Sequence, residues 1–321
     1  MSNFNLKDVS EAHERVKHFI RKTPLEASYF LGNENTNYYF KLESFQKVKS
    51  FKIRGALNKM LTLTEVEKNR GVATVSSGNH GSAVSYAASL LGIKNVKIII
   101  PQNTPQSKID KIKYFGGETI LLGKDYDEAH ALGMKYIEKS GLTFIDAYYS
   151  DPLIYAGQGT IAIEILEQNN EIDTIIVPIG GGGLITGIAV AAKTLKPEIR
   201  IIGVQTEACP AMIAAYRDRI FYEAYPSKES ICDAVIGGIG KLSFELAKEY
   251  VDEFLTVSEV SIAKAVSFMA KEEKYIVEAG SCMTVAAIMD YKEQIGGKNV
   301  ALVLSGGNID GKLLASLLNQ Y

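Results

Sequence analysis

The chain has 321 residues, of which 46% are hydrophobic and 22% are charged, and its formal net charge at pH 7 is −2. Lysines are spread along the chain, which excludes the basic stripe of a nucleic-acid-binding protein and the polybasic anchor of a membrane-surface protein. The sequence has neither a signal-peptide pattern nor an apolar segment of membrane-spanning length. We therefore expect a cytoplasmic protein that acts on a small molecule and has no nucleic-acid or membrane partner.

Short β-branched segments alternate with helix-forming segments along the chain. The predicted strands cover residues 37–43, 71–77, 95–101, 118–123, 173–179, 200–205 and 299–305. Helices are predicted between them, for example over residues 80–91, 106–115 and 183–195. This alternation predicts an α/β fold with open, mostly parallel sheets covered by helices on both faces. No linker divides the chain into two consecutive blocks, so any second domain must be inserted into the first.

In chain order, the first notable segment is ESFQKVKSFKIRGALNKM, residues 43–60. Ser50 is predicted to cap a helix that carries Lys52 in its first turn. Judged by residue type alone, Lys52 reads as a surface lysine, because lysines are almost always exposed.

Three glycine-rich turns follow predicted strands: SSGNHG at residues 76–81, GGGG at 180–183 and SGGN at 305–308. A strand, a glycine turn and a helix start bring backbone N–H groups and the positive end of a helix dipole to one point, which favours an anion such as phosphate. The four glycines match neither the dinucleotide pattern GxGxxG nor a Walker A loop, so a tight packing turn is an equal alternative for this motif alone. Three such turns at the carboxyl ends of parallel strands favour a ligand site.

Five motifs in a fixed order carry a family resemblance: SFKIRGAL (50–57), SSGNHG, AGQGTIAIEIL (156–166), VPIGGGGLITG (177–187) and LSGGN (304–308). The chain resembles the fold-type II pyridoxal-phosphate enzymes, specifically the threonine/serine dehydratase and serine racemase family. The resemblance implies a tryptophan synthase β-like fold with two open, twisted sheets. It also implies a large cofactor-binding domain of residues 1–65 together with 149–321, a small domain of residues 66–148 inserted in it, and the cofactor in the cleft between them. The chain resembles the short catabolic type, so we expect no carboxyl-terminal regulatory domain.

The resemblance also implies roles for single residues. Lys52 would bond covalently to pyridoxal 5'-phosphate and later remove the α-proton of the substrate. The other cofactor contacts would be Phe51 against the pyridine ring, Asn79 at its phenolic oxygen, Ser305 at its nitrogen, and the N–H groups of Gly180, Gly181, Gly182 and Gly183 on the phosphate. A serine hydroxyl cannot keep the ring nitrogen protonated as a carboxylate would, which favours rapid expulsion of a β-hydroxyl group.

The turn that contains Ser76, Ser77, Asn79 and His80 would bind the substrate carboxylate. Ser77 separates two activities, because racemases of the family use a serine here as a second acid on the face of Cα opposite the lysine. Some eliminating members also have this serine, and a small residue in a tight turn is the remaining alternative.

The resemblance predicts β-elimination of L-threonine or L-serine to a 2-oxo acid and ammonia, by a homodimer or homotetramer. Serine racemase is the alternative, motivated by Ser77. A non-catalytic amino-acid-binding homologue is a third hypothesis. It is prompted by Val48-Lys49, where relatives have Thr-Gly, and by the altered segment ICDAVIGG at residues 231–238.

No metal is expected. Gln205 stands where metal-activated racemases have a glutamate, and Ala211 falls near their aspartate. The cysteines Cys209, Cys232 and Cys282 are far apart in sequence and odd in number, so we expect buried thiols and not a disulfide framework or metal site.

Overall fold

The structure, a computed structural model, describes residues 4–321 and places its strands in two sheets. The six-stranded sheet has the order β1-β2-β10-β7-β8-β9, and the four-stranded sheet has the order β5-β4-β3-β6. The strands are Leu25–Ala27 (β1), Asn37–Leu42 (β2), Val72–Val75 (β3), Val96–Ile100 (β4), Glu118–Leu121 (β5), Thr143–Phe144 (β6), Thr174–Pro178 (β7), Arg200–Thr206 (β8), Glu253–Val257 (β9) and Asn299–Leu304 (β10).

The helices connect these strands and cover both sheets. They are Leu6–Val16 (α1), Lys52–Leu61 (α2), Glu65–Arg70 (α3), Asn79–Leu90 (α4), Gln106–Tyr114 (α5), Tyr126–Ser140 (α6), Pro152–Gln168 (α7), Gly183–Leu195 (α8), Ala211–Asp218 (α9), Lys241–Tyr250 (α10), Glu259–Lys271 (α11), Ala279–Ile295 (α12) and Gly311–Gln320 (α13), with a 3-10 turn at Glu43–Phe45 (η1).

Neighbouring strands run parallel in both sheets, except that β1 pairs antiparallel with β2 at one edge. At the centre of the larger sheet, Val300 of β10 lies opposite Tyr38 of β2 and opposite Thr174 of β7. The predicted α/β fold with two mostly parallel sheets is therefore confirmed.

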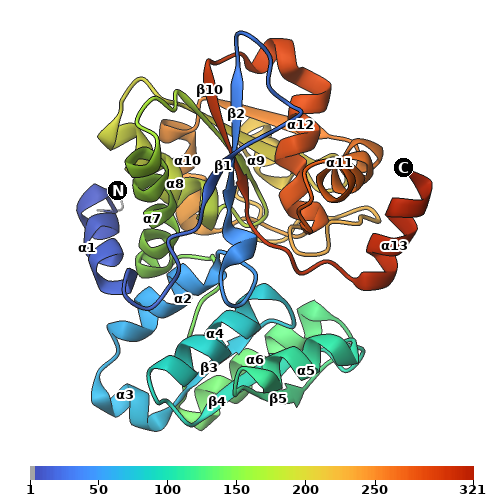
Figure 1. Cartoon of the computed structure of the whole chain (residues 1–321). Coiled ribbons are helices and arrows are strands. Elements are labelled where there is room, and N and C mark those ends of the chain that lie inside the picture. Colours follow the sequence, from blue (N-terminus) through green and yellow to red (C-terminus); the bar gives the residue numbers. More distant parts are fainter. Residues whose placement is uncertain (1–3) are drawn as a thin grey trace.

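The central strands of the larger sheet bury both of their faces. In β7, Ile175 and Val177 join the apolar core on one side of the sheet, and Ile176 between them joins the core on the other side. This alternation follows from the two-residue repeat of a strand, and it explains why a strand covered on both faces reads as an unbroken apolar run. Helices α1, α7, α8 and α10 cover one face, and α11, α12 and α13 lie beyond the other (Figure 1).

The smaller sheet is built in the same way. Ile98 of β4 faces the core shared with α4 and α5, whereas Ile99 faces the core shared with α6. All four of its strands fall between residues 72 and 144. The division into a domain of residues 1–65 with 149–321 and an inserted domain of residues 66–148 stays a prediction.

Helix α2 lies between the two sheets, where it packs against α7 on one side and α4 on the other (Figure 1). Its buried face carries Ile53, Ala56, Leu57 and Met60, at helical spacing. The amino-terminal end of α2 is therefore held where the helices of both sheets meet.

The predicted strands and helices are present, with small shifts at their ends. The strand predicted over residues 118–123 ends at Leu121, and the helix predicted from His80 begins at Asn79. Strands β1, β6 and β9 were not predicted: β1 and β6 have only three and two residues, and β9 carries a glutamate and a threonine among its apolar residues.

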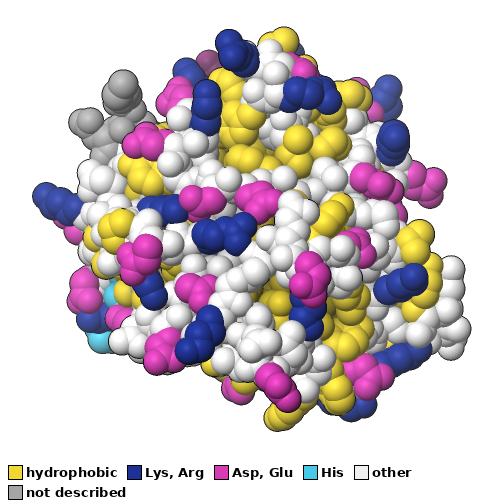
Figure 2. Space-filling view, turned by 90° about the horizontal axis from the view of Figure 1, so that it is seen from above, with side chains coloured by type: hydrophobic (Ala, Val, Ile, Leu, Met, Phe, Trp, Pro, Cys, Tyr) yellow, Lys and Arg dark blue, Asp and Glu magenta, His cyan; other side chains and the backbone are white. Residues whose placement is uncertain are grey.

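Charged side chains of both signs are scattered over the face seen from above, with hydrophobic side chains exposed between them (Figure 2). Within residues 4–321, no helix combines the length and the apolar character needed to cross a membrane. The three cysteines are buried and free, as predicted.

Candidate active site

The three predicted glycine turns follow β3, β7 and β10. Strands β7 and β10 are neighbours in the larger sheet, so their turns share one edge, whereas β3 belongs to the smaller sheet. The turn after β3 reaches the turn after β10 directly, because the Asn308 side-chain amide donates a hydrogen bond of 2.5 Å to Asn79 Oδ1. The structure thus joins the carboxyl edges of two different sheets.

Lys52 is the first residue of α2. The N-cap position is occupied by Phe51 and not by the predicted Ser50, but Ser50 Oγ still accepts a hydrogen bond of 3.2 Å from the Lys52 backbone N–H. The preceding N–H, that of Phe51, donates to the Ser305 carbonyl at 2.9 Å. The start of α2 is therefore tied to the turn that follows β10.

The Lys52 amine points into a polar and aromatic environment. Its Nζ donates to the Ala147 carbonyl at 3.2 Å and lies 5.2 Å from the centre of the Phe51 ring and 5.7 Å from that of Tyr148. Burial lowers the pKa of Lys52 to about 8, and the charges of Asp146 and Glu278 limit this shift. More of the amine is therefore neutral and nucleophilic near neutral pH than in an exposed lysine.

A loop ordered by Asp146 presents Ala147 and Tyr148 to this amine. The Asp146 carboxylate accepts four hydrogen bonds, of 2.8–3.2 Å, from the backbone N–H groups of residues 148–151. Burial alone would raise the pKa of Asp146, but these four donors hold it below its usual value. The loop connects β6 to α7, so it fixes the Tyr148 ring relative to both sheets.

The four glycines form the turn between β7 and α8. Gly182 adopts a φ of +90°, and a Cβ atom there would lie 2.6 Å from Met212 Cε. A Cβ atom on Gly181 would lie 2.1 Å from Cδ2 of the Tyr148 ring. Within the described part of the chain, the N–H groups of residues 180–183 have no hydrogen-bond acceptor. These groups lie at the amino terminus of a 13-residue helix, an arrangement that favours an anion, and a side chain at Gly181 or Gly182 would clash with its neighbours.

His80 is buried just inside α4. Its Nε2 lies 3.1 Å from the Ile145 carbonyl oxygen, to which it donates, and its Nδ1 has no partner among the described residues. Burial and the nearby charge of Lys52 lower the pKa of His80 to about 4. The imidazole is therefore neutral at physiological pH.

The two serines of the same turn are less enclosed. Ser76 Oγ accepts a hydrogen bond of 3.4 Å from the Gly78 N–H, and the Ser77 hydroxyl, which is half-buried, has no hydrogen bond within residues 4–321. Ser305 is buried, and its Oγ lies 2.8 Å from Ser281 Oγ, which in turn accepts the Gly306 N–H at 2.7 Å.

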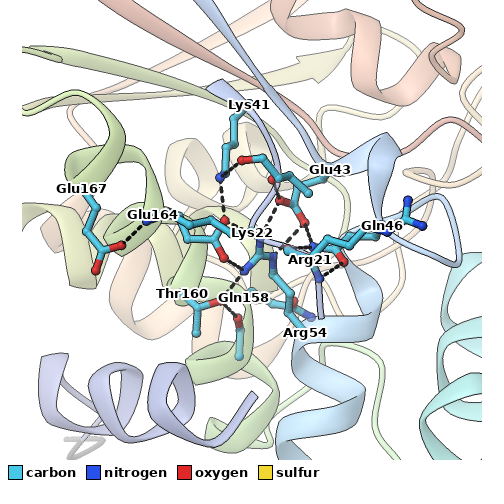
Figure 3. A network of polar contacts seen from close by, with 12 residues as sticks. Arg21, Lys22, Lys41, Glu43, Gln46, Arg54, Gln158, Thr160, Glu164 and Glu167 are labelled. Carbon is cyan, nitrogen blue, oxygen red and sulfur yellow. Dashed lines mark hydrogen bonds and ion pairs between the residues drawn. The ribbon is translucent and has the colours of Figure 1, made fainter. Parts of the chain in front are cut away.

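A buried ion network anchors the first turn of α2 (Figure 3). Arg54 forms paired hydrogen bonds with the carboxylates of both Glu43 and Glu164, at 2.7–2.8 Å. Lys41 Nζ also donates to Glu164, at 2.6 Å. The two cations balance the two anions, so the helix that carries Lys52 is held by a neutral, fully hydrogen-bonded cluster.

The sequence did not single out Glu278 or Tyr148, whose side chains lie against the predicted site residues Asn79 and Gly181. Glu278 immediately precedes α12, which is the usual place for a capping residue, but its carboxylate caps nothing and accepts Asn79 Nδ2 at 2.9 and 3.1 Å. Nothing in the local pattern connects two residues that are 199 positions apart.

Val235, within the altered segment 231–238, lies against Gly180, as a residue lining the glycine turn would.

Residues 16–306 match the family described as "Pyridoxal-phosphate dependent enzyme". The chain belongs to this family. It is 41% identical over 317 residues to an L-threonine ammonia-lyase of Thermotoga maritima, which covers 98% of this chain and 78% of the relative. It is 38% identical over 313 residues to a catabolic L-threonine dehydratase of Staphylococcus aureus, covering 95% and 89% of the two chains. Maize serine racemase superposes with a TM-score of 0.92 at 32% identity, over 99% of this chain and 98% of the other.

The residues present fit the cofactor of this pyridoxal-phosphate-dependent family. The glycine turn offers unpaired N–H groups of the kind a phosphate needs. The Lys52 amine lies close to this turn, because both the amine and Gly181 lie against the Tyr148 ring. Pyridoxal phosphate carries an aldehyde, which needs a nucleophilic amine, and a phosphate, which needs N–H donors. The Lys52 amine with its lowered pKa and the N–H groups of the glycine turn provide these two partners.

Two departures from the family pattern have structural explanations. Lys49 has a φ of +63°, in the left-handed region that glycine adopts without strain, which accounts for the glycine in relatives. Gln205 Oε1 accepts the N–H groups of Met212 and Ile213 at 3.0 and 3.2 Å, so this side chain supports the first turn of α9.

Proposed function

We propose that the protein is a pyridoxal-phosphate-dependent ammonia-lyase that converts L-threonine, L-serine or both into a 2-oxo acid and ammonia. The observation that carries the proposal is the Lys52 amine, with its pKa lowered to about 8, beside the unpaired N–H groups of the glycine turn. The 41% identity to an L-threonine ammonia-lyase over nearly the whole chain supports the choice of reaction.

We assign the cofactor contacts as the sequence resemblance implies. The N–H groups of residues 180–183 bind the phosphate, and Phe51 packs on the ring. Asn79 donates to the phenolic oxygen, and the Ser305 hydroxyl faces the ring nitrogen. When bound, pyridoxal phosphate withdraws electrons from the substrate's Cα. Lys52 holds the cofactor and then takes the proton from Cα.

The substrate carboxylate is assigned to the start of α4. Ser76, Ser77, Asn79 and His80 surround this helix end, where backbone N–H groups and the helix dipole favour an anion. His80 is neutral, so it orders the turn through its bond to the Ile145 carbonyl and adds no positive charge.

Amino-acid racemisation is the second candidate function. The likeness to maize serine racemase favours it, together with the half-buried Ser77 hydroxyl, which remains available as a second proton donor. If racemisation is the function, Ser77→Ala abolishes formation of D-serine and leaves elimination intact.

The test is a product analysis of the cofactor-loaded protein with L-threonine and with L-serine. Oxo acid and ammonia in equal amounts, with little D-serine, support the proposed function. D-serine as the main product would replace it with racemisation. Absence of both products from either substrate, with the cofactor bound, would refute the proposal in favour of a non-catalytic amino-acid-binding protein. Lys52→Ala serves as the inactive control.

We also infer a homodimer or homotetramer in the cytoplasm. The resemblance to a family of metabolic enzymes supports both inferences. Light scattering during size-exclusion chromatography tests the first point, and a monomer would contradict it.

A further inference from the structure

A continuous line of polar side chains links the two sheets beside Lys52. It begins at Lys111 on α5, whose Nζ donates to Asn308 Oδ1. Asn308 Nδ2 donates to Asn79 Oδ1 at 2.5 Å, and Asn79 Nδ2 donates to both oxygens of Glu278, at 2.9 and 3.1 Å. Two amides thus connect a cation to a carboxylate.

The chemistry of the two ends fixes the orientation of both amides. A lysine ammonium can only donate, so the amide oxygen of Asn308 must face Lys111. The Val48 carbonyl can only accept, and it receives Asn308 Nδ2 at 3.1 Å and Lys111 Nζ at 3.3 Å. Asn308 then presents its nitrogen to Asn79, so the oxygen of Asn79 must face Asn308 and its nitrogen must face Glu278. Turning either amide by 180° would place two donors or two acceptors against each other.

This orientation determines what Asn79 can offer to a ligand. The two Glu278 oxygens belong to one carboxylate and lie on the same side of Asn79 Nδ2, so they take one of its two hydrogens. The Asn79 oxygen is occupied by Asn308. One N–H of fixed direction remains, which suits an anionic oxygen.

Lys111 lies between the helices of the smaller sheet and the turn that follows β10 of the larger sheet. Burial lowers the pKa of Lys111 to about 8, while Glu278 favours its charged form. One helical turn earlier on α5, Lys108 forms an ion pair of 2.8 Å with Asp233. Both lysines therefore connect α5, which covers the smaller sheet, to segments that belong to the larger sheet's part of the molecule.

We propose that Lys111 is a positioning residue, which acts through Asn308 to hold the Asn79 amide with its free N–H toward the cofactor oxygen. The inference rests on the proposed function, since it deepens the role assigned to Asn79. The role assigned to Lys111 is therefore indirect, through its hydrogen bond to Asn308.

The test compares Lys111→Met, Lys111→Arg and the control Lys113→Met, which changes an exposed lysine on the same helix. The readouts are kcat and KM for L-threonine, and the affinity and visible spectrum of bound pyridoxal phosphate. Loss of a charge-assisted bond predicts that Lys111→Met lowers kcat/KM by about 10-fold to 100-fold. Both the cofactor affinity and the position of its absorption band should change. Lys111→Arg keeps the donor and should recover part of the loss, and Lys113→Met should behave as the wild type.

A double-mutant cycle separates positioning from general destabilisation. In the Asn308→Ala background, Lys111→Met should have little further effect, because the connection to Asn79 is already broken. Equal effects of Lys111→Met in both backgrounds, or no effect in the wild-type background, would overturn the inference.

A last measurement distinguishes failure of this inference from failure of the proposed function. In the cofactor-free protein labelled with 15N-asparagine, the side-chain resonances of Asn79 and Asn308 should shift in Lys111→Met and stay in place in Lys113→Met. Unchanged resonances in Lys111→Met would overturn the inference. A wild type that forms no oxo acid would refute only the function.

Discussion

Replacing Arg54 by methionine is expected to destabilise the protein strongly. Arg54 is fully buried and makes five hydrogen bonds, four of them to the carboxylates of Glu43 and Glu164 and one to Thr160 Oγ1. Both carboxylates are buried as well, at 0% and 3% exposure. Methionine retains much of the volume but leaves a buried cluster with two anions and only one cation, Lys41.

The structure allows the size of this effect to be worked out. Removing one partner of a buried ion pair costs about 3–5 kcal/mol, because the remaining charge stays desolvated. An unfolding entropy of about 2 cal/mol/K per residue, over the 321 residues of the chain, converts this loss into a fall in Tm of about 5–8 °C. Arg54→Lys keeps the charge but not the paired geometry, so its loss should be smaller.

The effect of Arg54→Met should also depend on pH. In the wild type, burial raises the pKa of Glu164, but Arg54 and Lys41 outweigh it and hold the pKa below its ordinary value. Without Arg54 that pKa rises, and a protonated carboxyl group no longer carries the unpaired charge. The variant's deficit in stability should therefore be largest near pH 8 and shrink toward pH 5.

The assay is thermal unfolding followed by circular dichroism at several pH values. The matched control is Arg217→Met, because Arg217 is exposed and paired only with the neighbouring Asp218 among the described residues. That change should stay within about 0.5 kcal/mol. A Tm change of less than about 1 °C for Arg54→Met, or a deficit that grows as the pH falls, would show that the charge of Arg54 does not stabilise the cluster.

Three further predictions concern the site. Incorporation of pyridoxal phosphate into the cofactor-free protein should accelerate as the pH rises through about 8, because only the neutral amine of Lys52 reacts. Stopped-flow absorbance measures this rate, and a pH dependence of the rate with its midpoint near 10.5 would contradict the prediction. Gly181→Ala should lower cofactor affinity at least 10-fold, because the new Cβ would meet the Tyr148 ring. In the control Gly311→Ala the new Cβ would point into open space, so the affinity should not change. Equal affinities of the two variants by titration would count against the glycine turn as the phosphate site. The pKa of His80 is lowered to about 4 from 6.5, so its protonation favours unfolding and the Tm should fall as the pH drops from 6.5 toward 4. His80→Gln should reduce this slope, and an unchanged slope would mean that another group is responsible.

The sequence predicted the larger elements because strands buried on both faces, such as β7 and β10, form continuous β-branched runs that end in glycine. It did not predict β6, because two residues beside a longer strand carry no periodicity of their own. The five ordered motifs located Lys52, the glycine turn and Asn79, which the structure brings to one region. Their catalytic and binding roles remain predictions.

The sequence did not predict residues whose contacts are with partners far away along the chain. Tyr148 matters because Asp146 folds residues 148–151 around its carboxylate, which brings the ring against Gly181. Lys111 resembles any lysine on an amphipathic helix until the fold places Asn308 against it. Such contacts depend on the arrangement of the two sheets, which local pattern does not specify.

Among the lysines of the chain, we propose that Lys52 holds the cofactor. Reduction of the cofactor-loaded protein with borohydride, followed by proteolysis and mass spectrometry, identifies the lysine that carries the cofactor's mass. We expect one labelled peptide that contains Lys52, and no label in Lys52→Ala. Labelling of Lys111 or Lys49 with Lys52 unmodified would contradict the site described here.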